Sequence, residues 1–175
     1  MSRIPYDLSL IKGVVFDIDG VLSPVTVPLG DDGIPRRMTN LRDGYSIARS
    51  SATGAIQLCI ISGADAPGLL QRFSVLGIKN VYLGMADKLL CLQRWASKYG
   101  LKPEEIAYVG DDIPDLPCLR YVGLPVVPAD GAAECRECAR FVTKASGGYG
   151  VARELLEEIL KVKGLWASFG DASKS

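Results

Sequence analysis

Two carboxylates stand at the end of the first apolar segment of the chain, at a spacing that could support chemistry. The run Lys12-Gly-Val-Val-Phe-Asp-Ile-Asp-Gly20 is typical of a strand buried on both faces, and it ends in Asp17 and Asp19. Because side chains alternate along a strand, the two acids point to the same side. Gly20 then permits a tight turn or a close approach of the backbone to a ligand. Two like charges held together in this way need a cation or a proton to compensate them.

Three further groups of polar residues stand where apolar segments end or helices begin. They are Ser62-Gly63, Lys88, and the acidic group Asp111, Asp112 and Asp115. In an open parallel sheet, ligands bind beyond the carboxyl ends of the strands. We therefore expect these groups and the Asp17 pair to meet at one edge of a sheet.

Each of these groups has a plain structural explanation when it is taken alone, as a turn, a helix cap or a surface charge. Together they would place several carboxylates side by side, which is costly without a cation. Oxygen ligands in a chain without histidine favour a hard cation, so the sequence predicts a Mg²⁺ site.

The overall composition excludes several classes of function. The 175 residues include no histidine, which excludes Ser-His-Asp, Cys-His and histidine–zinc mechanisms. The 20 basic and 20 acidic side chains give a formal net charge of zero, which argues against a nucleic acid or an anionic membrane as the main partner. The first residues lack the pattern of a signal peptide, and no apolar run is long enough to span a membrane. We expect a cytoplasmic protein.

The five cysteines are predicted to be reduced thiols. Cys135 and Cys138 form a CxxC pair, but no second pair and no histidine accompany them, so a zinc site is not expected. The pair is interpreted as two small residues one helical turn apart, with redox chemistry as the alternative.

Strand-like and helix-like segments alternate along the chain, with short connections between them. Strands are predicted near 14–16, 56–61, 80–83, 105–109, 123–127 and 140–143, and helices near 43–53, 65–76, 86–99, 112–121, 131–137 and 150–162. This alternation predicts an α/β fold with a doubly wound parallel sheet, in a single domain over 1–175. Residues 23–38 are expected to form a projecting β-hairpin with strands at 25–29 and 34–38, and 167–175 a mobile tail.

The polar groups resemble, in order, the four motifs of the haloacid dehalogenase (HAD) phosphatase superfamily. The matching residues are Asp17-Ile-Asp19, Ser62, Lys88 and Gly110-Asp-Asp-Ile-Pro-Asp115. The resemblance implies a phosphomonoester hydrolase that works through an aspartyl-phosphate intermediate.

The same resemblance implies a role for each of these residues. Asp17 would be the nucleophile and Asp19 the general acid and base. Mg²⁺ would be held by Asp17, the Asp19 backbone carbonyl and Asp111, while Ser62 and Lys88 bind the phosphoryl group. Asp112 and Asp115 would support the site without touching the ion, with Asp115 orienting Lys88 or a metal-bound water.

The connections between the motifs leave no room for a cap domain over the site. Such an enzyme either acts on a macromolecule or receives its lid from another subunit, for which the segment 23–38 is the natural candidate. A finer resemblance covers most of the chain and points to the 3-deoxy-D-manno-octulosonate 8-phosphate (KDO 8-phosphate) phosphatase family. The segments that carry it are 40–45, 110–115, 122–130, 147–154 and 164–166.

That family resemblance implies a Mg²⁺-dependent homotetramer that makes KDO for lipopolysaccharide, with neighbouring subunits completing each site. The small phosphorylated sugar acid would be bound by the Asn40 to Gly44 segment as well as by the phosphate-binding residues. This predicted substrate-binding set is Asp19, Asn40, Leu41, Arg42, Asp43, Gly44, Ser62, Gly63 and Lys88. Arg42 could pair with the substrate carboxylate, and Asn40 and Asp43 could bind its hydroxyl groups.

Two positions depart from the family pattern, because Ala48 and Ala64 stand where many members have basic residues. Arg36, Arg37 or an arginine of another subunit, such as Arg153, could replace them. The alternatives are a phosphatase for the nine-carbon 2-keto-3-deoxy-nonulosonate 9-phosphate, a non-catalytic oligomerisation domain of the same fold, and a capless protein phosphatase. The Arg42-Asp43-Gly44 segment favours the eight-carbon substrate, and the complete set of motifs argues against an idle domain.

Overall fold

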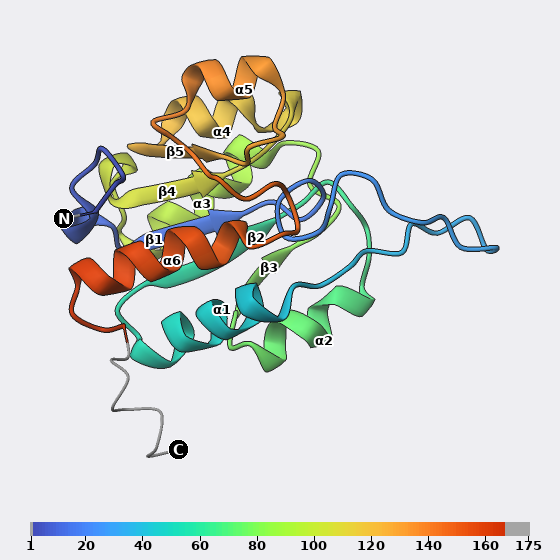
Figure 1. The fold of residues 1–175 in the computed structure, drawn as a ribbon, viewed down its shortest axis with the longest axis horizontal. Coiled ribbons are helices and arrows are strands. Elements are labelled where there is room, and N and C mark those ends of the chain that lie inside the picture. Colours follow the sequence, from blue (N-terminus) through green and yellow to red (C-terminus); the bar gives the residue numbers. More distant parts are fainter. Residues whose placement is uncertain (1, 167–175) are drawn as a thin grey trace.

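A single parallel sheet organises the chain in this computed structural model, which describes residues 2–166. The predicted mobile tail at 167–175 lies outside the described residues. The six strands lie in the order β3-β2-β1-β4-β5-β6, and all five pairings are parallel (Figure 1). Their bounds are β1 Gly13–Phe16, β2 Gln57–Ile61, β3 Asn80–Tyr82, β4 Ile106–Val109, β5 Leu124–Val127 and β6 Phe141–Val142. The predicted doubly wound parallel sheet is confirmed.

Helices cover both faces of this sheet. Their bounds are α1 Leu41–Thr53, α2 Gly68–Val75, α3 Lys88–Tyr99, α4 Leu116–Tyr121, α5 Ala133–Cys138 and α6 Val151–Val162. Alternation along β1 divides the core, because Val14 and Phe16 pack with α1, α2 and α6, whereas Val15 packs with α3, α4 and α5. Burial on both faces explains why the strands are continuous apolar runs. Within the described residues, no helix is long and apolar enough to cross a membrane.

The chain builds the sheet outward from β1 in both directions, with β2 and β3 on one side and β4, β5 and β6 on the other. The carboxyl ends of β1, β2 and β4 therefore lie next to one another. Phe16 is in register with Ile60 of β2 and with Val109 of β4. The residues that follow these three strands are therefore neighbours, although they are far apart in the sequence. This topological switch point is where open α/β sheets bind their ligands.

Residues 23–38, which we call the arm, project from the sheet edge as predicted, but they do not form the two expected strands. The arm closes on itself through one antiparallel bridge between Leu29 and Pro35, with Gly30 N donating to Ile34 O at 2.9 Å. Pro24, Pro28 and Pro35 cannot donate the hydrogen bonds that a regular ladder requires, so the prediction of strands at 25–29 and 34–38 was wrong.

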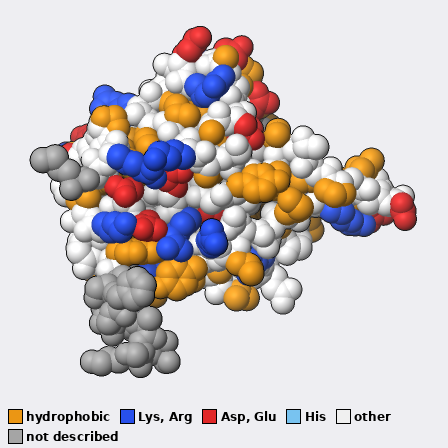
Figure 2. All heavy atoms as spheres, in the orientation of Figure 1, with side chains coloured by type: hydrophobic (Ala, Val, Ile, Leu, Met, Phe, Trp, Pro, Cys, Tyr) orange, Lys and Arg blue, Asp and Glu red, His pale blue; other side chains and the backbone are white. Residues whose placement is uncertain are grey.

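The side chains of the arm are unusually apolar for a projecting segment. Val25, Leu29 and Ile34 are 65%, 70% and 51% exposed. Figure 2 shows hydrophobic side chains along the arm and charged ones toward its tip, where Arg36 pairs with Asp32 at 2.7 Å. Apolar surface on an extended segment is typical of an interaction site.

The other helices and strands predicted from the sequence are confirmed, with bounds that differ by a few residues. Helix α1 begins at Leu41 because the Asn40 side chain accepts hydrogen bonds from the Arg42 and Asp43 amides, which makes Asn40 its N-cap. The five cysteines are free thiols, and Cys138 Sγ donates to the Cys135 carbonyl within α5. This geometry agrees with a structural role for the CxxC pair.

Candidate active site

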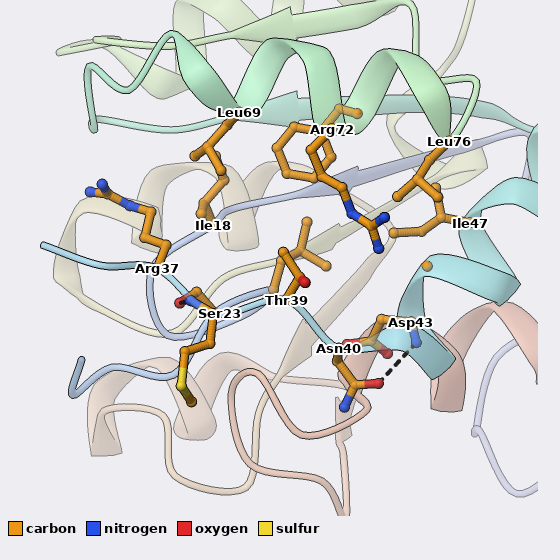
Figure 3. Close-up of a pocket in the computed structure, with 14 residues that line it drawn as sticks. Ile18, Ser23, Arg37, Thr39, Asn40, Asp43, Ile47, Leu69, Arg72 and Leu76 are labelled. Atoms are coloured by element: carbon orange, nitrogen blue, oxygen red, sulfur yellow. Dashed lines mark hydrogen bonds between the residues drawn. The ribbon is translucent and has the colours of Figure 1, made fainter. Parts of the chain in front are cut away.

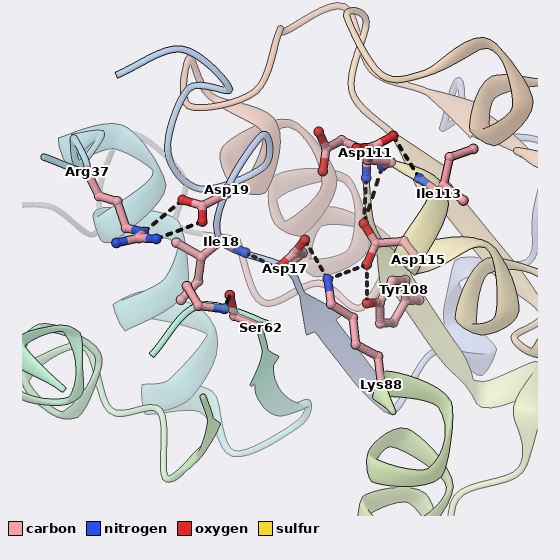
Figure 4. A network of polar contacts seen from close by, with 12 residues as sticks. Asp17, Ile18, Asp19, Arg37, Ser62, Lys88, Tyr108, Asp111, Ile113 and Asp115 are labelled. Carbon is pink, nitrogen blue, oxygen red and sulfur yellow. Dashed lines mark hydrogen bonds and ion pairs between the residues drawn. The ribbon is translucent and has the colours of Figure 1, made fainter. Parts of the chain in front are cut away.

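Asp17 lies directly beyond β1, at the switch point of the sheet. Its amide donates to Val109 O at 3.0 Å, which extends the pairing with β4 by one residue. Its carboxylate accepts from the Ile18 amide at 2.7 Å and from Lys88 Nζ at 2.8 Å (Figure 4). Lys88 is the first residue of α3, so the helix start and the strand end fix the two partners independently.

Asp115 holds Lys88 from the other side and is itself fully enclosed. Its carboxylate accepts from Lys88 Nζ at 2.8 Å, from Tyr108 Oη at 2.7 Å and from the Asp111 amide at 3.0 Å. Only 1% of the residue is exposed. Asp115 thus orients both the lysine and the loop that carries Asp111, which agrees with one of its two predicted roles.

Tyr108 is a member of this network that sequence reasoning missed. It lies in β4 with its ring in the core below α3 and α4, and its hydroxyl reaches Asp115. A tyrosine in an otherwise aliphatic buried strand was the available signal, because a buried phenol needs a hydrogen-bond partner.

Asp111 approaches the loop after Asp17 so closely that only glycine fits opposite it. A Cβ atom on Gly20 would lie 1.9 Å from Asp111 Oδ2, and Gly20 also has φ of +78°. The loop before α6 packs against the same glycine, since a Cβ on Gly147 would lie 2.0 Å from Gly20 O. The backbone at Gly20 therefore packs directly against Asp111 and the loop before α6, where a side chain would not fit.

The electrostatics of the site favour a bound cation. Oxygen atoms of Asp17, Asp111 and Asp115 all lie within 4.8 Å of one another, and Lys88 is the one cation that the described residues bring into contact with them. Burial, followed by repulsion from Asp115, raises the pKa values of both Asp17 and Asp111 to about 7. Burial lowers the pKa of Lys88, but the Asp17 and Asp115 carboxylates outweigh it and the net change is upward. Lys88 alone does not supply enough positive charge to keep both carboxylates ionised at such a pH, and a Mg²⁺ ion on Asp17 and Asp111 fits that need.

Because the pKa values of Asp17 and Asp111 are raised, magnesium binding should change the thermal stability of the protein in a way that depends on pH. Without metal, the folded state retains protons on Asp17 and Asp111 that the unfolded chain loses above about pH 4, so stability falls as pH rises toward about 7. Mg²⁺ replaces those protons. At a concentration about 100-fold above its Kd it should raise Tm by about 5–10 °C at about pH 8.

The matching measurement is Tm with and without Mg²⁺ across this pH range. The gain should shrink at about pH 5, where protons compete with the metal. An equal gain at both pH values, or an equal gain in Asp111→Asn, would contradict a metal site on these carboxylates.

Ser62 and Gly63 follow β2 on the other side of Asp17. Ser62 is buried, its amide donates to Tyr82 O at 2.9 Å and its Oγ accepts from the Ala64 amide at 3.2 Å. Ser62 and Gly63 line an open cleft of about 300 Å³ together with the acidic residues, including exposed Asp112, which caps the short turn Ile113–Asp115. The structure therefore brings together the predicted catalytic and metal residues on one side of the sheet edge.

Asp19 lies in the same cleft, but its carboxylate turns away from the acidic cluster. It accepts two hydrogen bonds from Arg37 of the arm, at 2.8 Å to Oδ1 and 2.9 Å to Oδ2. Figure 4 shows this pair on the far side of Ile18 from Asp17 and Lys88. The sequence named Arg37 as a possible substrate ligand but did not predict this ion pair.

The segment from Asn40 to Gly44 forms the start of α1 rather than the wall of the acidic cleft. Leu41 is 78% exposed and Arg42 is also exposed, whereas Asp43 is buried. Asp43 Oδ1 accepts from the Arg153 amide at 2.7 Å, at the start of α6, while its Oδ2 is buried without a hydrogen-bond partner in the described residues. Burial raises the pKa of Asp43 to about 6.

A second, smaller hollow of about 30 Å³ contains an arginine that the sequence did not point to. It lies between the arm, α1 and α2, and Asn40, Asp43 and Gly44 line it together with Arg37 and Arg72 (Figure 3). The Arg72 guanidinium lies 2.7 Å from where a Cβ of residue 44 would be, so Gly44 makes room for it. Within residues 2–166, Arg72 makes no ion pair and its side chain donates no hydrogen bond.

The fold is that of the haloacid dehalogenase-like hydrolases, whose family model matches residues 74–155. The 3-deoxy-D-manno-octulosonate 8-phosphate phosphatase KdsC of Escherichia coli K12 is 37% identical over 154 residues, which cover 88% of this chain and 81% of that relative. The chain belongs to the KDO 8-phosphate phosphatase family.

Solved structures agree with this assignment. The KDO 8-phosphate phosphatase of Yersinia pestis is 34% identical with a TM-score of 0.85, over 90% of this chain and 85% of that one. The enzyme of Moraxella catarrhalis, solved with a magnesium ion, a phosphate ion and KDO, is 32% identical with a TM-score of 0.83, over 89% and 88% of the two chains.

Proposed function

We propose that this protein is a Mg²⁺-dependent phosphatase that hydrolyses KDO 8-phosphate to KDO and phosphate in the synthesis of lipopolysaccharide. The observation that carries the proposal is the Asp17–Lys88–Asp115 network beside Asp111, at the switch point of a family member's sheet. A buried carboxylate held by an ammonium group in an open cleft is a competent nucleophile.

The proposed reaction has two halves, both centred on Asp17. In the first, the Asp17 carboxylate attacks phosphorus in line, the phosphorus–oxygen ester bond breaks, and Asp19 gives its proton to the leaving alcohol. In the second, Asp19 takes a proton from water as the water attacks phosphorus, which releases phosphate and restores Asp17. Asp19 needs no histidine for either transfer.

The remaining residues of the cleft bind the charge that moves during these steps. Lys88 and Ser62, with the amide of Gly63, line the cleft and would bind phosphoryl oxygens. Asp17, Asp111 and the Asp19 backbone carbonyl would hold Mg²⁺, which when bound neutralises charge on the phosphoryl group. Asp115 keeps Lys88 and the Asp111 loop in place, and Asp112 caps the turn that follows.

The carboxylate of the sugar acid is assigned to the mouth of the smaller hollow, which is too small to hold the whole sugar. Arg72 projects into it without a partner of its own in the described part of the chain, and Asn40 lies opposite. A guanidinium group binds a carboxylate through paired hydrogen bonds. Arg72 can thus supply the positive charge that is missing at Ala48 and Ala64.

This assignment predicts a defect in binding rather than in chemistry for Arg72→Ala. Loss of a charge-assisted hydrogen bond of about 1.5–3 kcal/mol should raise KM for the sugar-acid phosphate about 10- to 100-fold. The value of kcat, and activity on a phosphate ester without a carboxylate, should change little. The control is Gln71→Ala, an exposed neighbour on α2. Equal defects on both substrates would contradict the assignment.

The direct test of function is phosphate release with Mg²⁺ from KDO 8-phosphate, its nine-carbon homologue and glucose 6-phosphate. We expect kcat/KM on KDO 8-phosphate to exceed that on glucose 6-phosphate by about 100-fold or more. A preference for the nine-carbon substrate would select the alternative phosphatase. No turnover of any ester would indicate the non-catalytic domain.

We further propose a homotetramer in which the apolar arm packs against neighbouring subunits and helps to complete their sites. The exposed Val25, Leu29 and Ile34 side chains support this assembly. Light scattering at the concentration of the assay checks it, and a fully active monomer would contradict it.

A further inference from the structure

Tyr108 belongs to the polar network of the site, although it does not line the cleft. The residue is fully buried, and its hydroxyl donates to Asp115 Oδ1 at 2.7 Å (Figure 4). We infer that Tyr108 is a positioning residue that acts through Asp115 on Lys88, and thereby keeps the ammonium group aimed at the phosphoryl oxygens. The inference rests on the proposed function, because it assigns a supporting residue to the same reaction.

The Asp115 carboxylate is held by donors on both of its oxygen atoms. Oδ2 accepts from the Asp111 amide at 3.0 Å and from the Asp112 amide at 3.4 Å. Oδ1 accepts from Tyr108 Oη at 2.7 Å and from Lys88 Nζ at 2.8 Å. The backbone amides fix Oδ2, so the direction in which Oδ1 points depends on the tyrosine and the lysine.

Of the two donors to Oδ1, the tyrosine is the one that the fold holds rigidly. Tyr108 lies in the middle of the sheet, in register with Val15 of β1 and Pro125 of β5. Its ring is enclosed in a close-packed core, where a side chain keeps a single rotamer. Lys88 reaches the same oxygen through a flexible four-carbon chain. Tyr108 therefore fixes Asp115, and Asp115 in turn directs the lysine.

The direction of the Lys88 ammonium group matters because it has only three N–H donors. One donates to Asp17 Oδ2 and one to Asp115 Oδ1, both at 2.8 Å. The third is left for a phosphoryl oxygen in the cleft. Once Asp17 has accepted the phosphoryl group it is no longer a carboxylate, and Asp115 is then the remaining ion-pair partner of Lys88 within residues 2–166. The tyrosine hydroxyl would hold that partner in place through both halves of the reaction.

The first test is Tyr108→Phe, which removes one oxygen atom and keeps the ring. We expect kcat on KDO 8-phosphate to fall about 10-fold while KM changes less than about 3-fold. A misdirected ammonium group still attracts the phosphate dianion, but it stabilises the transition state less. The same loss of kcat is expected on p-nitrophenyl phosphate, because Lys88 acts on the phosphoryl group and not on the leaving group.

The matched control separates this role from a purely structural one, since any buried phenol needs a hydrogen-bond partner. Tyr99 Oη donates to Asn80 Oδ1 at 3.0 Å, at the opposite end of α3 from Lys88. Tyr99→Phe and Tyr108→Phe each lose one tyrosine hydrogen bond, and each should lower Tm by about 2–8 °C. Only Tyr108→Phe should lower kcat. Circular dichroism at the assay temperature, with Mg²⁺ present, verifies that both variants are folded.

A double variant identifies the residue through which Tyr108 acts. Lys88→Met is expected to retain a low but measurable kcat. If Tyr108 acts through the lysine, adding Tyr108→Phe to this background should lower the remaining kcat by less than about 2-fold, although the same change costs about 10-fold in the wild type.

Four results would overturn the inference. Wild-type kcat in Tyr108→Phe would show that the hydroxyl serves stability alone, and an equal loss of kcat in Tyr99→Phe would indicate a general effect of lost stability. A loss on KDO 8-phosphate alone would place the effect on the sugar. A full loss in the Lys88→Met background would show that Tyr108 does not act through the lysine. If instead the wild-type enzyme turns over neither ester, the proposed function fails, and that result is distinct from these four.

Discussion

Asp17→Asn is expected to lower kcat on KDO 8-phosphate by about 10⁴-fold or more. An amide is not a nucleophile toward phosphorus, and no other residue lies in the same place beyond β1. The variant should fold, because Asn has the shape of Asp and can still accept a hydrogen bond from Ile18 or from Lys88. Steady-state phosphate release, with circular dichroism to verify folding, measures the effect.

Two further results would support a nucleophilic role for Asp17. Mg²⁺ should raise the Tm of Asp17→Asn less than that of wild type, because one proposed metal ligand is lost. Asp65→Asn, an exposed acid on the loop after β2, should change kcat less than about 3-fold and serves as the control. Activity of Asp17→Asn near that of wild type would rule out the assignment.

Lys88→Met should have the second largest effect, on catalysis and stability together. Removing the ammonium group takes away a charge that faces the phosphoryl oxygens, at an expected cost of about 10²- to 10³-fold in kcat. It also leaves Asp17 and Asp115 buried without their ammonium partner, which raises the folded-state pKa of Asp17 further. The metal-free variant should therefore lose stability relative to wild type as pH rises from about 5 to about 8.

Comparison of Tm at these two pH values, in chelator, checks the stability effect. Lys98→Met removes an exposed lysine from the other end of α3 and should show no such pH dependence. A Lys88→Met variant that is equally stable at both pH values would show that Lys88 does not compensate the two acids.

The sequence was sufficient to predict the fold and most of the acidic site, because both depend on local patterns. Apolar runs of strand length predicted the parallel sheet, and polar residues at the ends of those runs predicted the meeting of Asp17, Lys88 and Asp111. A helix was predicted at 43–53, and the structure begins it at Leu41 with Asn40 as its N-cap. Each of these predictions needs only the period of a strand or helix and the rule that parallel strands end at one edge.

The contacts that the sequence did not predict all depend on tertiary placement. Tyr108 bonds Asp115 across a turn, and Arg72 reaches the Asn40 segment only because α2 packs beside α1. The pairing of Arg37 with Asp19 required the path of the arm, which prolines keep out of regular strand geometry. Asp43 was expected to face substrate, but its buried contact with the start of α6 could not be inferred from its neighbours in sequence.

The close contacts around Gly20 limit how this enzyme could evolve toward other substrates. A methyl group at Gly20 would overlap Asp111, and one at Gly147 would overlap the backbone of Gly20. Neither Gly20 nor Gly147 can therefore be replaced by a residue with a side chain, even where such a side chain would help to bind a new substrate. Variation in specificity is therefore expected from the arm and from α2, which line the hollow assigned to the substrate carboxylate. Libraries aimed at new sugar phosphates should randomise those two segments and keep the glycine loops unchanged.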